Sequence, residues 1–112
     1  MKKDVKIFLE HTLESINLIE EYIEGKSKSD FFESKQLQDS IIRRIEIIGE
    51  AIKKFPEETK ETHSDIPWKK IIGMRDILIH QYFGVDLNLT WEVIEEDIPK
   101  LKKQIISIKN QI

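Results

Sequence analysis

Apolar residues recur at three- and four-residue steps along most of this chain, a spacing that lines one face of an α-helix. The first stripe predicts a helix over about 5–24, which Gly25 ends. A second helix starts at Asp30 or Ser34, either of which could cap it, and Pro56 stops it. The two stripes consist of Val5, Phe8, Leu9, Leu13, Ile16, Ile19, Tyr22 and Ile23, and of Leu37, Ile41, Ile45, Ile48 and Ile52.

The segment 57–65 is acidic and predicts a short helical turn followed by a loop. A third helix opens at Pro67, because the fixed φ of proline suits the first helical turn. The apolar pattern then continues through Arg75 and His80, so this helix is expected to end near Gly84.

A last helix begins around Trp91, and Pro99 predicts a kink in it or a break into two pieces. Gly49 lies inside the second helix, where a small residue permits close approach of another helix. The candidates for the cap of the last helix are Asp86, Asn88 and Thr90.

Composition supports a helical protein. The 112 residues are 39% hydrophobic and 35% charged, and they include only 4 glycines and 3 prolines, too few for the many turns of a small β-sandwich. The chain shows neither an internal repeat nor a linker, so the prediction is a single domain over 1–112. Its expected fold is an all-α, up-down bundle of four or five helices.

Charge and cysteine content restrict the function. With no cysteine, disulfides and thiolate metal sites are excluded, and a reducing cytosol is the expected compartment. The chain lacks a secretory apolar region and any stretch of about 18 apolar residues, so we expect a cytoplasmic protein without a membrane span. A net charge of −3 argues against bulk electrostatic binding of nucleic acid. Any such contact requires a local patch, which two subunits could build together.

The candidate chemistry lies in the segment 75–82. Arg75 and His80 interrupt an otherwise apolar run, and Tyr82 follows. A guanidinium is costly to bury unpaired, so Arg75 must face a cleft, a partner or a ligand. Arginine can clamp a phosphate and histidine can transfer a proton, which are the two tasks of phosphodiester cleavage.

The spacing raises a geometric problem. Tyr82 follows Arg75 by seven positions and returns to nearly the same helix face. His80 follows by five positions and lies roughly 140° around a straight helix. Either the helix distorts or ends near His80, or a second copy across a twofold axis completes the site.

The wider order of motifs resembles the HepT-like branch of the HEPN (higher eukaryotes and prokaryotes nucleotide-binding) superfamily. Arg-x-x-x-x-His-x-Tyr is the most specific motif of this resemblance, which covers nearly the whole chain. The segments that carry it are Ile47-Ile48-Gly49-Glu50-Ala51, Ile66-Pro67-Trp68, Gly73-Met74-Arg75-Asp76, His80-Gln81-Tyr82 and Trp91.

This resemblance implies a homodimeric toxin, or a higher oligomer of it, that cleaves RNA without a metal or another cofactor. Arg75 and His80 would be the catalytic pair. The cognate antitoxin would be a minimal nucleotidyltransferase (MNT-type) that modifies Tyr82 with AMP. Asp76 departs from the asparagine that HEPN proteins often carry after the arginine; an acid there could orient Arg75 or His80, but it adds negative charge where phosphate should bind.

Structural interpretations of the same residues remain open. His80 could be a satisfied structural histidine, and Tyr82 could be an ordinary bundle aromatic with its hydroxyl at the rim. Arg75 could form an interhelical bridge, and the carboxylates available to it are Asp76, Glu50 and Glu46. We expect Glu50, beside Gly49, to be the preferred partner and to support the site.

A second function class is also compatible with the sequence. The chain could be a non-catalytic helical partner of a nucleotidyltransferase, with the motif segment as its docking and modification surface. Asp76 and the acidic pI of about 5.7 favour this alternative. Lys69 and Lys70 are candidates for RNA backbone contacts, although such lysines usually lie on a solvated face.

Overall fold

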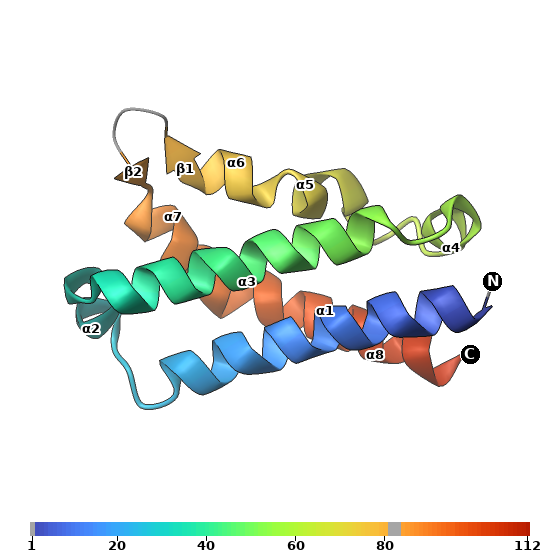
Figure 1. The fold of residues 1–112 in the computed structure, drawn as a ribbon, viewed down its shortest axis with the longest axis horizontal. Coiled ribbons are helices and arrows are strands. Elements are labelled where there is room, and N and C mark those ends of the chain that lie inside the picture. The colour runs from blue at the N-terminus through green and yellow to red at the C-terminus, as the bar shows by residue number, and fades with distance from the viewer. Residues whose placement is uncertain (1, 81–83) are drawn as a thin grey trace.

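The computed structural model describes residues 2–80 and 84–112 and confirms the predicted all-α class (Figure 1). Tyr82 therefore lies outside the described residues. Within them, no helix is both long and apolar enough to cross a membrane. The helices are α1 (Lys2–Ile23), α2 (Lys28–Glu33), α3 (Lys35–Lys53), α4 (Glu57–Thr62), α5 (Trp68–Ile72), α6 (Met74–Leu78), α7 (Leu87–Glu92), the π-helical η1 (Val93–Asp97) and α8 (Ile98–Asn110), and two short strands are β1 (Ile79–His80) and β2 (Gly84–Val85).

Helix α3 occupies the middle of the bundle. It packs against α1 on one side and against α5 and α6 on the other, while α8 packs against α1 (Figure 1). The predicted apolar stripes face this core. Leu9, Ile16 and Ile19 of α1 and Ile41 and Ile52 of α3 are fully buried. Each such side chain contributes about 1.5–3 kcal/mol relative to an exposed position.

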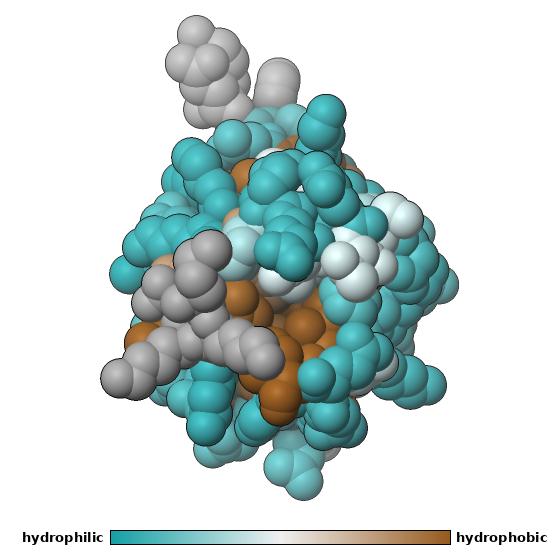
Figure 2. All heavy atoms as spheres, turned by 90° about the vertical axis from the view of Figure 1, so that its right-hand side faces the viewer, coloured by the Kyte–Doolittle hydropathy of each residue, from teal (hydrophilic) through white to brown (hydrophobic). Residues whose placement is uncertain are grey.

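Polar side chains cover most of the end of the bundle that holds α4 and the two termini (Figure 2). Apolar side chains show in a hollow in the middle of this face. Beneath the surface, Trp68 anchors α5 to α4, since its indole Nε1–H donates to the carbonyls of Lys60 and His63 at 3.1 and 3.0 Å. Trp68 is buried, as a core anchor should be.

Two caps replace the single helix start that the sequence predicted. Ser34 caps α3, because its Oγ accepts from the Leu37 N–H at 3.1 Å. The expectation that Asp30 could cap the same helix is wrong. Asp30 lies in the first turn of α2, where the Ser27 N–H donates to its carboxylate and Ser27 Oγ accepts from the Asp30 N–H. This capping box starts a separate short helix, and the Ser27 backbone hydrogen bond lowers the pKa of Asp30.

The predicted third helix from Pro67 to Gly84 is also wrong. α5 ends at Ile72 with Gly73 as its C-cap, α6 ends at Leu78, and the chain becomes extended at Ile79 (φ −106°, ψ 118°). Glycine has a low helix propensity, which explains the break at Gly73. β-Branched Ile79 suits the antiparallel pair, in which Ile79 lies opposite Val85 and His80 opposite Gly84. Gly84 adopts φ +76°, a left-handed conformation that glycine takes at no steric cost.

The last helical segment begins earlier than predicted and changes its winding before Pro99. Asp86 is the cap, since its Oδ1 accepts from the Leu89 N–H at 3.0 Å. The chain passes from α7 through η1 into α8, with Pro99 in the first turn of α8. Proline lacks an N–H and its ring crowds the carbonyl four residues earlier. The widened turn of η1 provides the distortion that the sequence predicted as a kink or break.

Helix α3 approaches α5 closely at Gly49. A Cβ at this position would lie 3.1 Å from the Ile72 carbonyl oxygen and 3.5 Å from that of Ile71. Both neighbours are backbone atoms, so neither can rotate away. The prediction that a small residue here permits close helix approach is confirmed.

We expect Gly49→Ala to lower the free energy of unfolding by about 1 kcal/mol. This is the balance between about 1–3 kcal/mol for overpacking and about 1 kcal/mol gained in helix propensity. Urea denaturation followed by circular dichroism measures it. Gly73→Ala is the matched control, because its Cβ would meet the Lys69 carbonyl oxygen at an ordinary 3.5 Å. A Gly49→Ala protein more stable than wild type would contradict the prediction.

Candidate functional site

Arg75 extends from the first turn of α6 toward α3. Its Nε lies 3.1 Å from Glu46 Oε2, and one terminal nitrogen lies 3.4 Å from Asp76 Oδ1. The Arg75 side chain is still 44% exposed. The guanidinium is therefore held at the surface by carboxylates, where an anion from solution can reach it.

Glu46 joins two arginines. Its Oε1 accepts from Arg43 at 2.7 Å, while Oε2 faces Arg75. The expectation that Arg75 would prefer Glu50 is wrong. Gly49 meets Ile72 where α3 and α5 cross, and Glu46 lies three residues before Gly49, on the same helix face. Arg75 follows Ile72 by three residues, on a segment that runs antiparallel to α3 (Figure 1). Its side chain therefore reaches Glu46, while the Glu50 side chain is exposed to solvent.

His80 does not share a helix with Arg75. The helix ends at Leu78 and His80 lies in β1, which matches one of the alternatives that the spacing left open, a helix that ends near His80. The His80 side chain is 52% exposed, and its Nε2 lies 3.6 Å from Asp86 Oδ2. This contact is an ion pair when the imidazole carries its proton.

Asp86 is the residue whose site contact the sequence analysis missed. It was expected only as one of three possible helix caps, and it does cap α7. The sequence signal for this contact was the position of Asp86, six residues after His80 and two residues after Gly84, where a glycine permits the chain to reverse its direction. Only the pairing of β1 with β2 shows that this turn brings Asp86 beside His80.

The predicted site residues thus fall into two groups. Arg75 and Asp76 lie on α6 with Glu46 of α3, and His80 lies on β1 with Asp86. Arg75 and His80 each face a separate carboxylate from another helix or helix start. Tyr82 lies outside the described residues. Within residues 2–80 and 84–112, no three His, Asp or Glu side chains gather in a manner that could hold a metal ion.

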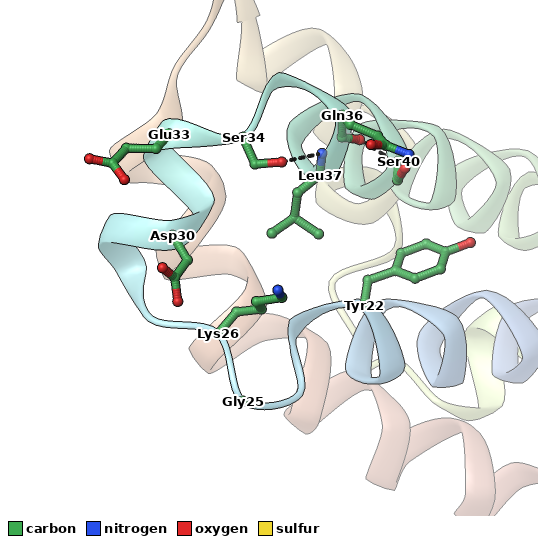
Figure 3. A pocket seen from close by; sticks show the side chains of 9 residues that line it. All are labelled: Tyr22, Gly25, Lys26, Asp30, Glu33, Ser34, Gln36, Leu37 and Ser40. Carbon is green, nitrogen blue, oxygen red and sulfur yellow. Dashed lines mark hydrogen bonds between the residues drawn. The ribbon is translucent and has the colours of Figure 1, made fainter.

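A separate hollow of about 520 Å³ lies between the end of α1, α2 and the start of α3 (Figure 3). Leu37 points into it between Lys26 and Tyr22, while the Glu33 carboxylate points outward. Ser34 on its rim already serves as the cap of α3. Among the residues that the structure describes, none of the predicted site residues lines this hollow, so the candidate site remains the surface around α6 and β1.

Comparison of the amino-acid sequence with known proteins indicates ribonuclease activity. The family model described as ribonuclease HepT-like matches residues 12–108. A Thermococcus cleftensis protein named "Probable ribonuclease HepT" is 47% identical over 102 residues, covering 91% of this chain and 93% of that protein. A Caldanaerobacter subterraneus subsp. tengcongensis protein named a "Putative RNase" is 45% identical over 106 residues, covering 95% of each.

One relative is a longer protein. A Methanocaldococcus jannaschii protein named "Gamma-glutamylcyclotransferase and putative RNase" is 62% identical over 112 residues, which are 100% of this chain and 50% of that protein. This chain therefore spans half the length of that relative. No solved structure matches the chain. The family match spans most of the sequence and includes both Arg75 and His80, and we conclude that this chain belongs to the ribonuclease HepT-like family.

Proposed function

We propose that this chain is a toxin ribonuclease that cleaves RNA with Arg75 and His80. The observation that carries the proposal is their placement: two exposed cationic or ionisable side chains flank the end of α6, within a ribonuclease family match. An exposed position is required because the RNA backbone must reach both groups.

The proposed reaction uses a hydroxyl of the substrate itself. The ribose 2′-oxygen attacks the adjacent phosphorus, the bond to the 5′-oxygen breaks, and a 2′,3′-cyclic phosphate and a free 5′-hydroxyl result. His80 takes the proton from the 2′-hydroxyl or delivers one to the leaving oxygen, tasks that suit imidazole near neutral pH. Arg75 stabilises the additional negative charge on the pentacoordinate phosphorus. A nucleophile supplied by the RNA makes a metal-bound hydroxide unnecessary for this step.

A second copy of the chain is proposed to complete the groove. Ile77 lies on the same short helix as Arg75 and is 49% exposed, so it is available for contact with another chain. Covering it with a second subunit across a twofold axis would bring two Arg75–His80 sets together. Such a pair would also concentrate positive charge locally on a chain of net charge −3.

Control of the toxin is proposed to act on Tyr82. This tyrosine follows His80 by two residues. A nucleotidyltransferase antitoxin that adds AMP to the phenol would place bulk and negative charge beside the catalytic histidine. Repulsion and occlusion would then exclude the RNA backbone.

The alternative is a non-catalytic partner of a nucleotidyltransferase. Two carboxylates beside Arg75, those of Glu46 and Asp76, favour this alternative because they compete with phosphate. Expression alone in bacteria separates the two hypotheses. A toxin arrests growth and Arg75→Ala relieves the arrest, whereas a partner subunit accumulates without harm.

We expect His80→Ala and Arg75→Ala each to reduce RNA cleavage by about 10²–10⁴-fold, the usual contribution of a positioned acid–base group or a transition-state donor. The assay measures the rate of cleavage of a labelled RNA in the presence of EDTA. Wild type should remain active there and should leave 2′,3′-cyclic phosphate ends.

His11→Ala is the matched control for these variants, because it removes an exposed imidazole from α1, away from the site. It should cleave at the wild-type rate. Equal cutting by wild type and His80→Ala, or cutting that EDTA abolishes, would contradict the proposed mechanism.

Asp76→Asn should strengthen binding of RNA. The Asp76 side chain is 85% exposed beside Arg75, so its charge repels an approaching phosphate. Removing an exposed charge worth about 0.2–1 kcal/mol lowers KM by about 1.5- to 5-fold at low salt. The difference should vanish near 1 M salt, where the screening length is about 3 Å.

Glu10→Gln provides the control for Asp76→Asn. It makes the same change in net charge on α1, which lies across α3 from α6 (Figure 1). Its KM should equal that of wild type. An unchanged or raised KM in Asp76→Asn would show that Asp76 orients Arg75 instead of repelling RNA.

A further inference from the structure

We infer that Asp86 is a positioning residue for His80, holding the imidazole through one carboxylate oxygen while the other caps α7. The inference rests on the proposed function, because it assigns how the catalytic histidine is oriented. The two oxygens have separate partners: Oδ1 accepts a hydrogen bond from the Leu89 N–H at 3.0 Å, and Oδ2 lies 3.6 Å from His80 Nε2, within ion-pair distance but beyond a hydrogen bond.

The backbone of Asp86 is held on both sides. The Asp86 N–H donates to the Leu78 carbonyl at 2.7 Å, which ties the start of α7 to the end of α6. The Asp86 carbonyl accepts from the Thr90 N–H at 2.9 Å and from the Thr90 hydroxyl at 2.7 Å. Thr90 is fully buried. Since the backbone and Oδ1 are both held, Oδ2 has little freedom to move away from His80.

On this inference, Asp86 favours one of the two imidazole nitrogens for contact with the substrate. A carboxylate accepts but cannot donate, so it favours a proton on Nε2. Nδ1 is then the nitrogen left to exchange a proton with RNA. The negative charge of Asp86 also stabilises the imidazolium formed during transfer, as the third group of a nucleophile–base–orienter set does.

The competing interpretation is that Asp86 only caps α7. The two roles can be separated, because asparagine and serine cap helices about as well as aspartate. In Asp86→Asn the amide can still accept from Leu89, but the negative charge is lost and an N–H₂ can face Nε2. In Asp86→Ser the cap remains, but the side chain is too short to keep the second contact.

The experiment measures kcat, KM and thermal stability of both variants with the same labelled RNA. We expect Asp86→Asn to lower kcat by about tenfold or more, the range for residues that orient a functional imidazole. KM should stay within about twofold, since Asp86 orients His80 and does not bind RNA in this scheme. The melting temperature should equal that of wild type, and Asp86→Ser should lose kcat as well.

Asp30→Asn is the matched control, because Asp30 is also a carboxylate that binds a backbone N–H at a helix start. It removes the same charge from a carboxylate that binds Ser27 instead of His80, and it should keep the wild-type kcat. A stable Asp86→Asn with wild-type kcat, or one altered in KM alone, would overturn the inference.

Loss of kcat only in proportion to loss of stability in both Asp86 variants would also overturn it, because capping would then explain the effect. These outcomes differ from failure of the proposed function. If wild type and His80→Ala cleave equally or not at all, both the function and the role of Asp86 are overturned. If wild type cleaves and His80→Ala does not, the Asp86 variants decide the inference alone.

Discussion

The backbone contact between α3 and α5 at Gly49 fixes the geometry on which the candidate site depends. Without a side chain at Gly49, the carbonyls of Ile71 and Ile72 approach the helix directly. The antiparallel course of the two segments then sets a register in which Gly49 meets Ile72 and Glu46 meets Arg75 one turn further on. A different separation would change both the partner of Arg75 and the direction in which α6 leaves the core.

The end of α6 at Leu78 is the second constraint. A continuous helix would separate Arg75 and His80 by roughly 140° around its axis. In the structure His80 follows an extended residue, and the strand pair turns the chain back so that Asp86 begins α7 beside it. The pairing of these two short strands therefore determines which carboxylate faces His80.

The sequence predicts those parts of the fold that depend on periodic burial. The stripes of α1 and α3, the cap at Ser34 and the distortion before Pro99 follow from residue type and spacing. The break at Gly73 was missed because one glycine leaves an apolar helical pattern intact. The choice of Glu46 over Glu50 depends on the register between two helices, and the contact of Asp86 with His80 depends on strands of two residues each, too short to show a period.

The carboxylates of Glu46 and Asp86 differ in how easily another group can displace them from Arg75 and His80. Glu46 holds Arg75 through an exposed ion pair, which is worth only about 0–1 kcal/mol. On the proposed mechanism, a substrate phosphate replaces Glu46 at little cost, and the ion pair keeps Arg75 in place until RNA arrives. Asp86 is held by hydrogen bonds to Leu78, Leu89 and Thr90, so it cannot leave His80 without disturbing the start of α7. On the proposed mechanism, Arg75 therefore exchanges Glu46 for the RNA phosphate when substrate binds. Asp86, in contrast, keeps His80 oriented throughout the reaction.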